Sequence, residues 1–238
     1  MSQYNIAFVN EVDSTNTFLK DLVKMQNLSA PYCVSASVQT NGKGQREKSW
    51  SSEAFSNVLA SFLVDNPGDL SVLSGLNSAA ALAVVSCLES VGLKNIEVKW
   101  PNDVYLKGEK IAGILTENVI AEQRIKYAVV GVGLNVNQVS FAGFDATSIA
   151  LATGKAYDTV DILHRLYNAF YQLLNQKSAS LLQSVNERLY KQGEVVTFEV
   201  DGRMNEYIIN SILANGNLEV LDNGEHLELA HHKVKWIK

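Results

Sequence analysis

The stretch that decides the fold reads KWPNDVYLKGEKIAGILTE and spans residues 99–117. The residues before it alternate between apolar and polar, which predicts a β-strand over 96–100 that Pro101 brings to an end. Two short apolar runs, Val104–Leu106 and Ile111–Thr116, flank a turn-forming segment and predict a β-hairpin. The stretch therefore indicates three short strands that follow one another closely along the chain.

Helices and further strands are predicted on both sides of this stretch. Helical periodicity indicates helices, and short apolar runs bounded by turn residues indicate strands. The helix over 71–91 is apolar on nearly every face, which is typical of a helix buried against a sheet. The predicted helices cover 13–25, 71–91, 160–174 and 179–190, and the remaining strands of this region cover 32–38, 57–64 and 125–136.

The chain changes character after Gly193. Four short apolar runs alternate there with Asp-Gly and Asn-Gly pairs. Such spacing is typical of antiparallel strands joined by tight turns and predicts a small β-barrel. The four runs cover 195–200, 206–213, 218–221 and 226–229. We therefore divide the chain into two domains, residues 1–190 and 191–238.

The composition excludes several classes of protein. Hydrophobic residues make up 47% of the 238 residues, enough to fill a core, so a disordered chain is excluded. Two cysteines cannot build a disulfide framework, and we find neither a secretory signal nor an apolar run of about 18 residues. A formal net charge of −5 argues against a surface devoted to nucleic acid. We therefore expect a soluble protein of the reducing cytoplasm, with neither DNA nor a membrane as a partner.

A polar loop with two glycines and three cations follows the strand over 32–38. The loop reads QTNGKGQREKSW from Gln39 to Trp50. Glycines allow backbone N–H groups to approach a ligand closely, and lysine or arginine suits a carboxylate or a phosphate. The indole of Trp50 can stack on a base. An ordinary surface loop anchored by a tryptophan explains the same residues equally well.

Three further segments carry groups that suit a ligand, and each also has a structural interpretation. Lys99 lies on the polar side of its strand, where it projects into a cleft or is simply a solvated strand end. Gly131 and Gly133 alternate, which indicates that something approaches one face of the strand, either a ligand near Asn135 or a neighbouring helix. The segment Ser14–Asn16 caps a helix or binds a small polar ligand.

In this order the segments resemble the biotin–protein ligase family, also named biotin–[acetyl-CoA-carboxylase] ligase. The resemblance runs from about residue 11 to residue 137 and continues into the C-terminal barrel. Its specific part is Lys-Trp-Pro-Asn-Asp at 99–103 followed by Lys-Ile-Ala-Gly-Ile-Leu-Thr-Glu at 110–117. Ser-Thr-Asn at 14–16, the loop over 39–50 and Gly-x-Gly-x-Asn at 131–135 complete the ordered set.

The resemblance implies an α+β fold, with a central mixed β-sheet flanked by helices as in class II synthetases and a small SH3-like barrel. It implies that ATP and Mg²⁺ activate biotin as biotinyl-5′-AMP, which a lysine of a biotin carboxyl carrier protein then attacks. The catalytic residues that it implies are Lys99 and Arg46. The implied biotin-binding residues are Ser14, Thr15, Asn16, Gln39, Gly42, Lys43, Gly44, Gln45, Lys99, Gly113 and Gly133. The implied ATP-binding residues are Lys43, Arg46, Trp50, Lys99, Asn102 and Asn135, with magnesium held through the phosphates.

The loop departs from the family pattern, and other functions remain open. Gln45 stands where an arginine is common and Glu47 where a glycine is usual, so the cation that meets the ligand is undecided and a stiffer loop is expected. A lipoate– or octanoate–protein ligase of related fold is one alternative. A repressor is another, although Ser14 leaves no room before it for a DNA-binding domain, so we expect no DNA binding. The resemblance also allows a homodimer through the central sheet.

Overall fold

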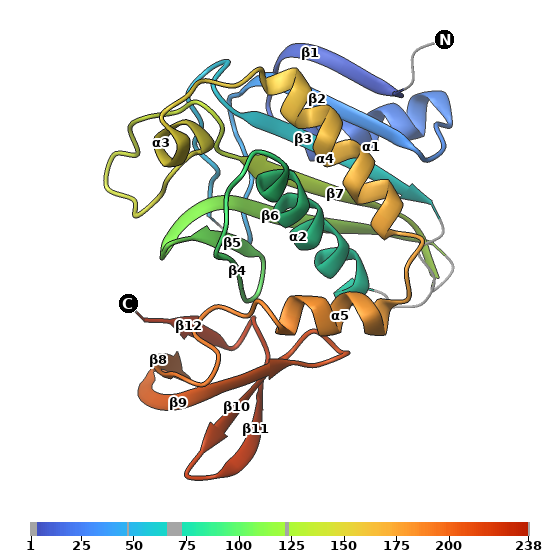
Figure 1. Ribbon diagram of the computed structural model, residues 1–238. Coiled ribbons are helices and arrows are strands. Elements are labelled where there is room, and N and C mark those ends of the chain that lie inside the picture. The colour runs from blue at the N-terminus through green and yellow to red at the C-terminus, as the bar shows by residue number, and fades with distance from the viewer. Residues whose placement is uncertain (1–3, 47, 66–72, 122–123, 238) are drawn as a thin grey trace.

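The computed structural model describes residues 4–237 apart from 47, 66–72 and 122–123. Its larger sheet has seven strands in the order β1-β2-β3-β7-β6-β5-β4 (Figure 1). These strands are β1 (Ile6–Val12), β2 (Tyr32–Gln39), β3 (Val58–Asp65), β4 (Ile96–Lys99), β5 (Asp103–Leu106), β6 (Glu109–Ala121) and β7 (Arg124–Leu134). Among the described strands of this sheet β1 and β2 run parallel and the other neighbouring pairs are antiparallel, so the sheet is mixed, as expected.

The stretch 99–117 folds as predicted. β5 and β6 form an antiparallel hairpin whose turn residues, Lys107 and Gly108, have φ angles of 52° and 83°. Positive φ at both positions matches the right-handed twist of the strands, and glycine adopts it without steric cost. β4 pairs with the other side of β5, so three successive strands build one end of the sheet.

Helices cover both faces of the larger sheet. They are α1 (Thr15–Gln26), α2 (Leu73–Ser90), α3 (Ile149–Thr153), α4 (Thr159–Leu173) and α5 (Ser178–Asn186). α1 packs on one face, against Val34, Leu63 and Val129. α2 and α4 lie in front of the sheet in Figure 1 and cover the opposite face, where Phe62 and Val130 are buried. Because side chains alternate along a strand, neighbouring residues reach opposite faces.

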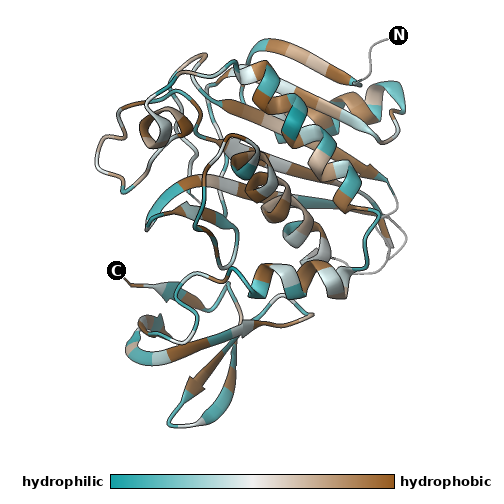
Figure 2. Cartoon of the chain, in the orientation of Figure 1, coloured by the Kyte–Doolittle hydropathy of each residue, from teal (hydrophilic) through white to brown (hydrophobic). Residues whose placement is uncertain are grey.

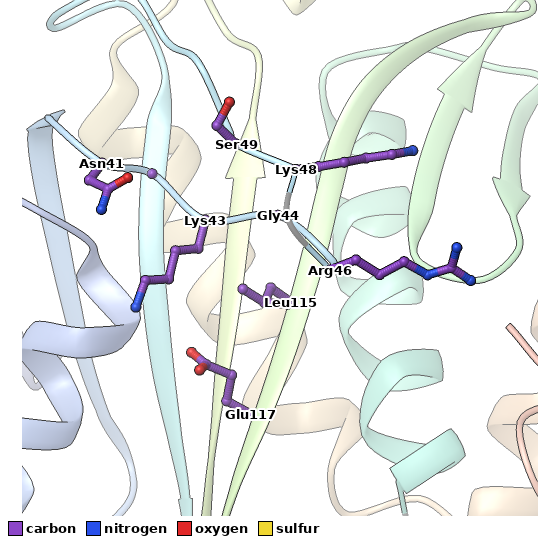
Figure 3. Close-up of a pocket in the computed structure, with 9 residues that line it drawn as sticks. Asn41, Lys43, Gly44, Arg46, Lys48, Ser49, Leu115 and Glu117 are labelled. Atoms are coloured by element: carbon purple, nitrogen blue, oxygen red, sulfur yellow. The ribbon is translucent and has the colours of Figure 1, made fainter. Parts of the chain in front are cut away.

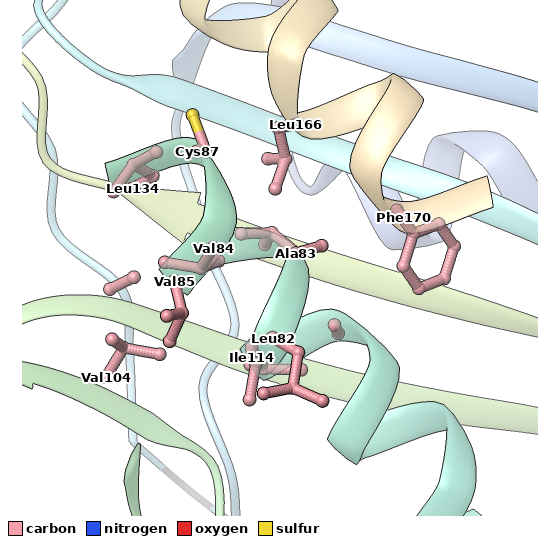
Figure 4. Packing of buried hydrophobic residues seen from close by; sticks show 14 of the residues in the cluster. Leu82, Ala83, Val84, Val85, Cys87, Val104, Ile114, Leu134, Leu166 and Phe170 are labelled. Atoms are coloured by element: carbon pink, nitrogen blue, oxygen red, sulfur yellow. The ribbon is translucent and has the colours of Figure 1, made fainter. Parts of the chain in front are cut away.

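The main core lies between the larger sheet and α2. This helix is apolar on most of its circumference and packs against the sheet, α4 and α5 (Figures 2 and 4). Every residue from Ala79 to Val85 is at most 8% exposed. The prediction of a buried helix in this region is therefore confirmed. Within the described residues, no helix has the length and apolar character needed to cross a bilayer.

The second, C-terminal sheet is antiparallel, in the order β11-β10-β9-β8-β12. Its strands are β8 (Val195–Val200), β9 (Arg203–Ile212), β10 (Leu218–Asp222), β11 (Glu225–Leu229) and β12 (Val234–Trp236). Two of the predicted turns, Asp201-Gly202 and Asn223-Gly224, have positive φ at both residues. Trp100, directly after β4, is buried in the core of this sheet, and its Nε1 donates to the carbonyl oxygen of Gly216 at 2.9 Å.

Sequence and structure differ at a few elements. The sequence does not predict β1, β12 or α3, because these elements are short or lie at a sheet edge with exposed side chains. The helix predicted over 179–190 ends at Asn186, because Arg188 and Tyr190 instead exchange backbone hydrogen bonds with Val98 in β4. The turn expected at 66–68 lies outside the described residues.

Candidate active site

Three glycines lie on the face of the larger sheet that α1 covers, and we call them the glycine face. Gly113 in β6 pairs directly with Gly133 in β7, and Gly131 lies two residues before Gly133. A Cβ at Gly131 would collide with the side chain of Asn16, and a Cβ at Gly133 would collide with Trp50. The interpretation that something approaches this face closely is confirmed, and the approaching groups are side chains of the chain itself.

A polar network lies at the start of α1 and consists of Thr15, Asn16, Gln39, Ser61 and Glu117. Gln39 Oε1 accepts from the backbone N–H and the hydroxyl of Thr15 at 2.8 and 3.0 Å. Ser61 Oγ lies 2.7 Å from Thr15 Oγ1 and 2.6 Å from Asn16 Oδ1. Asn16 Nδ2 donates to Glu117 Oε2 at 2.8 Å. The structure therefore brings together three of the implied biotin-binding side chains with Glu117, which ends the motif over 110–117, and with Ser61, which the sequence did not single out.

Ser14 occupies the N-cap position of α1, but its side chain makes no capping hydrogen bond. Gln39 in β2 supplies part of that interaction, because it accepts from the first N–H of the helix. The helix-capping interpretation is therefore wrong for the Ser14 side chain. Ser14 is 2% exposed and directly precedes the polar network in the chain.

Glu117 carries the negative charge of the polar network. Its Oε1 lies 2.8 Å from Lys20 Nζ. Burial, the largest single influence, would raise the pKa of Glu117, but hydrogen bonds from Lys20 and Asn16 together with the charges of Lys20 and Lys43 hold the pKa below its ordinary value. The carboxylate is therefore ionised at neutral pH.

The glycine-rich loop, residues 42–50, closes on itself through backbone hydrogen bonds. Trp50 N–H donates to the Gly42 carbonyl oxygen at 2.9 Å, and Gly44 N–H donates to that of Lys48 at 2.8 Å. A side chain at Gly42 would collide with the carbonyl oxygen of Trp50, so the closure requires glycine there. The two glycines thus give the loop its shape.

A cavity of about 390 Å³ lies between the glycine-rich loop and β6. Lys43, Arg46 and Lys48 line it from the loop, and Leu115 and Glu117 line it from β6 (Figure 3). Three cations against one carboxylate leave an excess of positive charge, which suits an anionic ligand. The three cationic residues are exposed, so the cavity is open to solvent.

The tip of the glycine-rich loop holds the residues that depart from the family pattern. Gln45 accepts through its carbonyl oxygen from Lys48 N–H at 3.2 Å and is not among the described residues that line the cavity. Arg46 has a φ of 59°, and its Nη2 donates to the carbonyl oxygen of Val234 in β12 at 3.1 Å. Glu47, for which we expected a stiffening effect, lies outside the described residues.

Trp50 packs on the glycine face and does not stand free to stack on a base. A Cβ at Gly113 would lie 2.8 Å from Cζ3 of the indole, which also fills the space beside Gly133. The Nε1 of Trp50 is buried and has no acceptor among the described residues. In this conformation the indole occupies the room that the glycines leave, and its contact with adenine stays a prediction.

The structure does not bring Lys99 to the cavity, although the resemblance implies that it is a catalytic residue. Its Nζ lies among three aromatic rings, 4.7 Å from the centre of Tyr105, 5.4 Å from Tyr190 and 4.7 Å from Trp236. Lys99 is not among the described residues that line the cavity. Lys99 pairs in register with Asp103, but its Nζ lies against the ring of Trp236 in the C-terminal sheet.

Lys110 begins the motif over 110–117, and the sequence predicted no function for it. Its Nζ lies 2.7 Å from Asp103 Oδ1 and 5.4 Å from the ring centre of Trp50. A Cβ at Gly113 would lie 3.3 Å from the same Nζ. The pairing of β5 with β6 skips Ile111, because Val104 pairs with Ala112 and Tyr105 with Lys110. This register shift places Lys110 on the same face as Gly113, although the two residues are three positions apart and strict alternation would put them on opposite faces.

The two asparagines implied in ATP binding make structural contacts. Asn102 Nδ2 donates to the carbonyl oxygen of Ile114 at 2.6 Å. Asn135 is 3% exposed, and its Nδ2 donates to the carbonyl oxygen of Thr147 at 3.0 Å. The buried amide of Asn135 therefore holds the segment that leads to α3, and its expected contact with a phosphate or a metal-bound water stays a prediction.

Solved structures of biotin protein ligases have the same fold as this chain. The biotin protein ligase from Aquifex aeolicus in complex with biotin and ATP matches with a TM-score of 0.81 and 24% identity, over 98% of this chain and 99% of that chain. The biotin protein ligase from Leishmania major in complex with biotinyl-5-AMP matches with a TM-score of 0.66 and 21% identity, over 95% and 98%. These similarities establish the fold.

Residues 8–135 match the Biotin/lipoate A/B protein ligase family, and the chain belongs to that family. The biotin--[acetyl-CoA-carboxylase] ligase of Paracoccus denitrificans is 32% identical over 169 residues, which is 66% of this chain and 68% of that protein. The bifunctional ligase/repressor BirA of Bacillus subtilis is 31% identical over 165 residues, 66% of this chain and 51% of that protein. The chain thus spans about half the length of the BirA proteins of Bacillus that it matches.

Proposed function

We propose that this chain is an ATP-dependent biotin–protein ligase. It activates biotin as biotinyl-5′-AMP and transfers the biotinyl group to a specific lysine of a biotin carboxyl carrier protein. The observation that carries the proposal is the excess of cations that the glycine-rich loop places over a cavity beside the polar network. The names of the relatives, which are ligases for biotin, favour this acid over others.

We place biotin between the polar network and the glycine face. Its bicyclic ring system is largely apolar, and its ureido group needs a few fixed donors and acceptors, such as the side chains of Thr15, Asn16 and Gln39. The ring system then takes the room above Gly133 that Trp50 fills here. The unpaired Nε1 of Trp50 favours this displacement, because a buried donor without an acceptor costs free energy.

The first chemical step needs positive charge where two anions meet. A carboxylate oxygen of biotin attacks the α-phosphorus of ATP, a new P–O bond forms, and the bond to pyrophosphate breaks. Lys110 lies on the glycine face and is placed to neutralise the biotin carboxylate and the α-phosphate, with Asp103 orienting it. Lys43, Arg46 and Lys48 are placed to bind the phosphate oxygens from the loop.

Magnesium supplies further positive charge when it is bound to the nucleotide phosphates. The described part of the chain contains no group of three or more histidine, cysteine, aspartate or glutamate side chains arranged for a metal ion. This donor set fits an ion that the phosphate oxygens and water hold, rather than an ion in a protein cage. We therefore assign magnesium to the nucleotide.

In the second step the uncharged amine of the acceptor lysine attacks the biotinyl carbonyl. A C–N bond forms, the C–O bond to AMP breaks, and the amine proton passes to solvent. The edge of β6 beyond Gly113 has no partner strand among the described residues, and Leu115 and Glu117 of that edge line the cavity. We place the carrier domain at this edge, as an added strand. A homodimer formed at the same edge would compete with the carrier, so the labelling rate per enzyme molecule should fall as the enzyme concentration rises.

Labelling of a carrier domain tests the proposed function. With ATP, magnesium and biotin the carrier is expected to gain one biotinyl group by mass, and pyrophosphate is expected to appear only when biotin is present. A carrier whose target lysine is replaced by arginine is the control. Labelling by lipoate or octanoate instead would establish the alternative ligase, and absence of any product with all three acids would refute a ligase.

Two further parts of the proposal concern location and partners. We place the reaction in the cytoplasm, where ATP is available and where free cysteines such as Cys33 and Cys87 stay reduced. We expect no specific DNA binding, and a gel shift with operator-like DNA measures it directly. A specific shift at low protein concentration would contradict that expectation.

A further inference from the structure

The Lys-Trp-Pro-Asn-Asp motif joins the two sheets of the molecule. Lys99 and Trp100 contact the C-terminal sheet, where Trp100 is part of the buried core. Asp103, four residues after Lys99, instead pairs with Lys110 on the larger sheet. One short motif therefore contributes both to the active site and to the joint with the C-terminal sheet.

Lys99 is enclosed by aromatic rings from three different segments. Tyr105 belongs to β5, Tyr190 follows α5, and Trp236 belongs to β12 of the C-terminal sheet. Lys99 Nζ also donates to the hydroxyl of Tyr105 at 3.2 Å, and the rings of Tyr105 and Tyr190 lie 4.9 Å apart. A cation against ring faces is stabilised most where water is excluded. Lys99 thus attaches β12 to the larger sheet.

The strand that carries Trp236 also holds the glycine-rich loop. Arg46 donates to the carbonyl oxygen of Val234, two residues before Trp236 in β12. β12 has three residues and, among the described strands, pairs with β8 alone. Such a short edge strand has little backbone pairing to fix it. The contact between Trp236 and Lys99 therefore helps to determine where the Val234 carbonyl lies.

We propose that Lys99 and Trp236 are positioning residues for the glycine-rich loop. In this proposal, which rests on the proposed function, Lys99 fixes Trp236, and β12 then holds Arg46 through the carbonyl of Val234. The Nη2 of Arg46 alone contacts this carbonyl, and a guanidinium has five N–H donors, so Arg46 can stay anchored to β12 and still donate to a phosphate. The C-terminal sheet therefore controls how readily the loop closes on the nucleotide, and Lys99 acts through this sheet.

Trypsin cleavage within the loop measures this control without any substrate. Trypsin cuts the peptide bond that follows a lysine or an arginine. The loop offers it three exposed residues of this kind, Lys43, Arg46 and Lys48. Trp236→Ala and Lys99→Met are expected to speed this cleavage about tenfold, because the loop loses its anchor. Trp236→Phe keeps a ring and Lys99→Arg keeps a cation, so both are expected to stay within about twofold of the unmodified protein.

The matched control removes packing from β10 of the same sheet, a strand that does not pair with β12. Val220 is 0% exposed in the core of the C-terminal sheet, so Val220→Ala should lower the melting temperature without speeding cleavage of the loop. Equal acceleration by Val220→Ala would show that general weakening of this sheet causes the effect, and it would overturn the proposal. If Trp236→Ala does not fold, Lys99→Met and Trp236→Phe decide the question.

Pyrophosphate release by the same variants gives the second measurement. Trp236→Ala and Lys99→Met are expected to raise the KM for ATP about tenfold and to keep kcat within about threefold. Unchanged KM and unchanged cleavage in both folded variants would overturn the proposal, as would a collapse of kcat in Lys99→Arg, since Lys99 would then touch the reacting groups. If the unmodified protein releases no pyrophosphate but its variants show the expected cleavage, the proposed function fails and the control of the loop by β12 stands.

Discussion

The two faces of the larger sheet are built by the same strands, and both carry apolar clusters, but they differ in their glycines and polar groups. β7 contributes Val130 and Val132 to the face under α2, and Gly131 and Gly133 to the face under α1. Alternation along a strand makes this division possible, because each residue reaches one face only. One face is a continuous apolar core, whereas the other carries the glycine face, the polar network and the cavity. Stability and activity should therefore respond to substitutions on different faces.

The largest effect on activity is expected from Lys110→Ala on the α1 face. Loss of this cation should slow adenylate formation about a thousandfold, because no other charge replaces it between the two anions. The free energy of unfolding should change by only about 1 kcal/mol, since the pair with Asp103 is partly exposed. Pyrophosphate release and urea unfolding measure the two quantities.

Lys99→Ala, compared with Lys110→Ala, decides which of the two lysines acts in adenylate formation. The sequence alone made Lys99 the catalytic lysine, whereas the structure assigns it to the joint with the C-terminal sheet. We expect Lys99→Ala to retain turnover at a raised KM for ATP. A thousandfold loss at Lys99 with near-normal turnover in Lys110→Ala would restore the assignment made from the sequence.

On the α2 face the largest effect is expected on stability. Leu134 is 0% exposed in the main core, so Leu134→Ala should lower the free energy of unfolding by about 2–5 kcal/mol. The KM values for biotin and ATP should stay unchanged below the melting transition, because this side chain faces away from the cavity. Urea unfolding and pyrophosphate release measure both, and a change in either KM would show that the faces are not independent.

Gly133, the residue next to Leu134, provides the matched test on the other face. A methyl group at Gly133 would collide with Trp50, so Gly133→Ala should displace the indole and occupy room that we assign to biotin. We expect the Kd for biotin to rise about tenfold, and we expect a smaller loss of stability than in Leu134→Ala. Isothermal titration with biotin measures the affinity, and unaltered binding would remove the glycine face from the proposed biotin site.

The sequence predicted the α2 face better than the α1 face. Its elements follow from burial of apolar side chains, which leaves a local pattern, and the helix over 71–91 and the hairpin of β5 and β6 are confirmed. The glycines of β7 also indicated a close approach correctly. The identity of the approaching group, Trp50, was not local information, because it depends on how the loop folds back onto the sheet.

The two lysines show why the site was harder to predict than the fold. Lys110 reaches the glycine face through a one-residue register shift, and no pattern in the sequence predicts that shift. Lys99 meets Trp236, and Arg46 meets Val234 at a separation of 188 residues, so both contacts depend on how the C-terminal sheet docks. A motif specified which residues matter, and only tertiary contacts distinguished their functions.

The smallest expected effect concerns the charge of Glu117 in the polar network. Its pKa lies below the ordinary value in the folded protein, so the stabilisation is present above the unfolded-state pKa of about 4.3 and is lost as the pH falls through the folded-state pKa. Glu117→Gln should therefore lower the free energy of unfolding by about 1 kcal/mol at about pH 7, and the difference from the unmodified protein should shrink toward about pH 3. Urea unfolding at both pH values measures it, with Glu206→Gln on an exposed strand position as the control. A difference that stays constant with pH would mean that Glu117 stabilises the fold through its packing and not through its charge. The polar network would then stabilise the fold as the α2 face does, by the packing of its side chains.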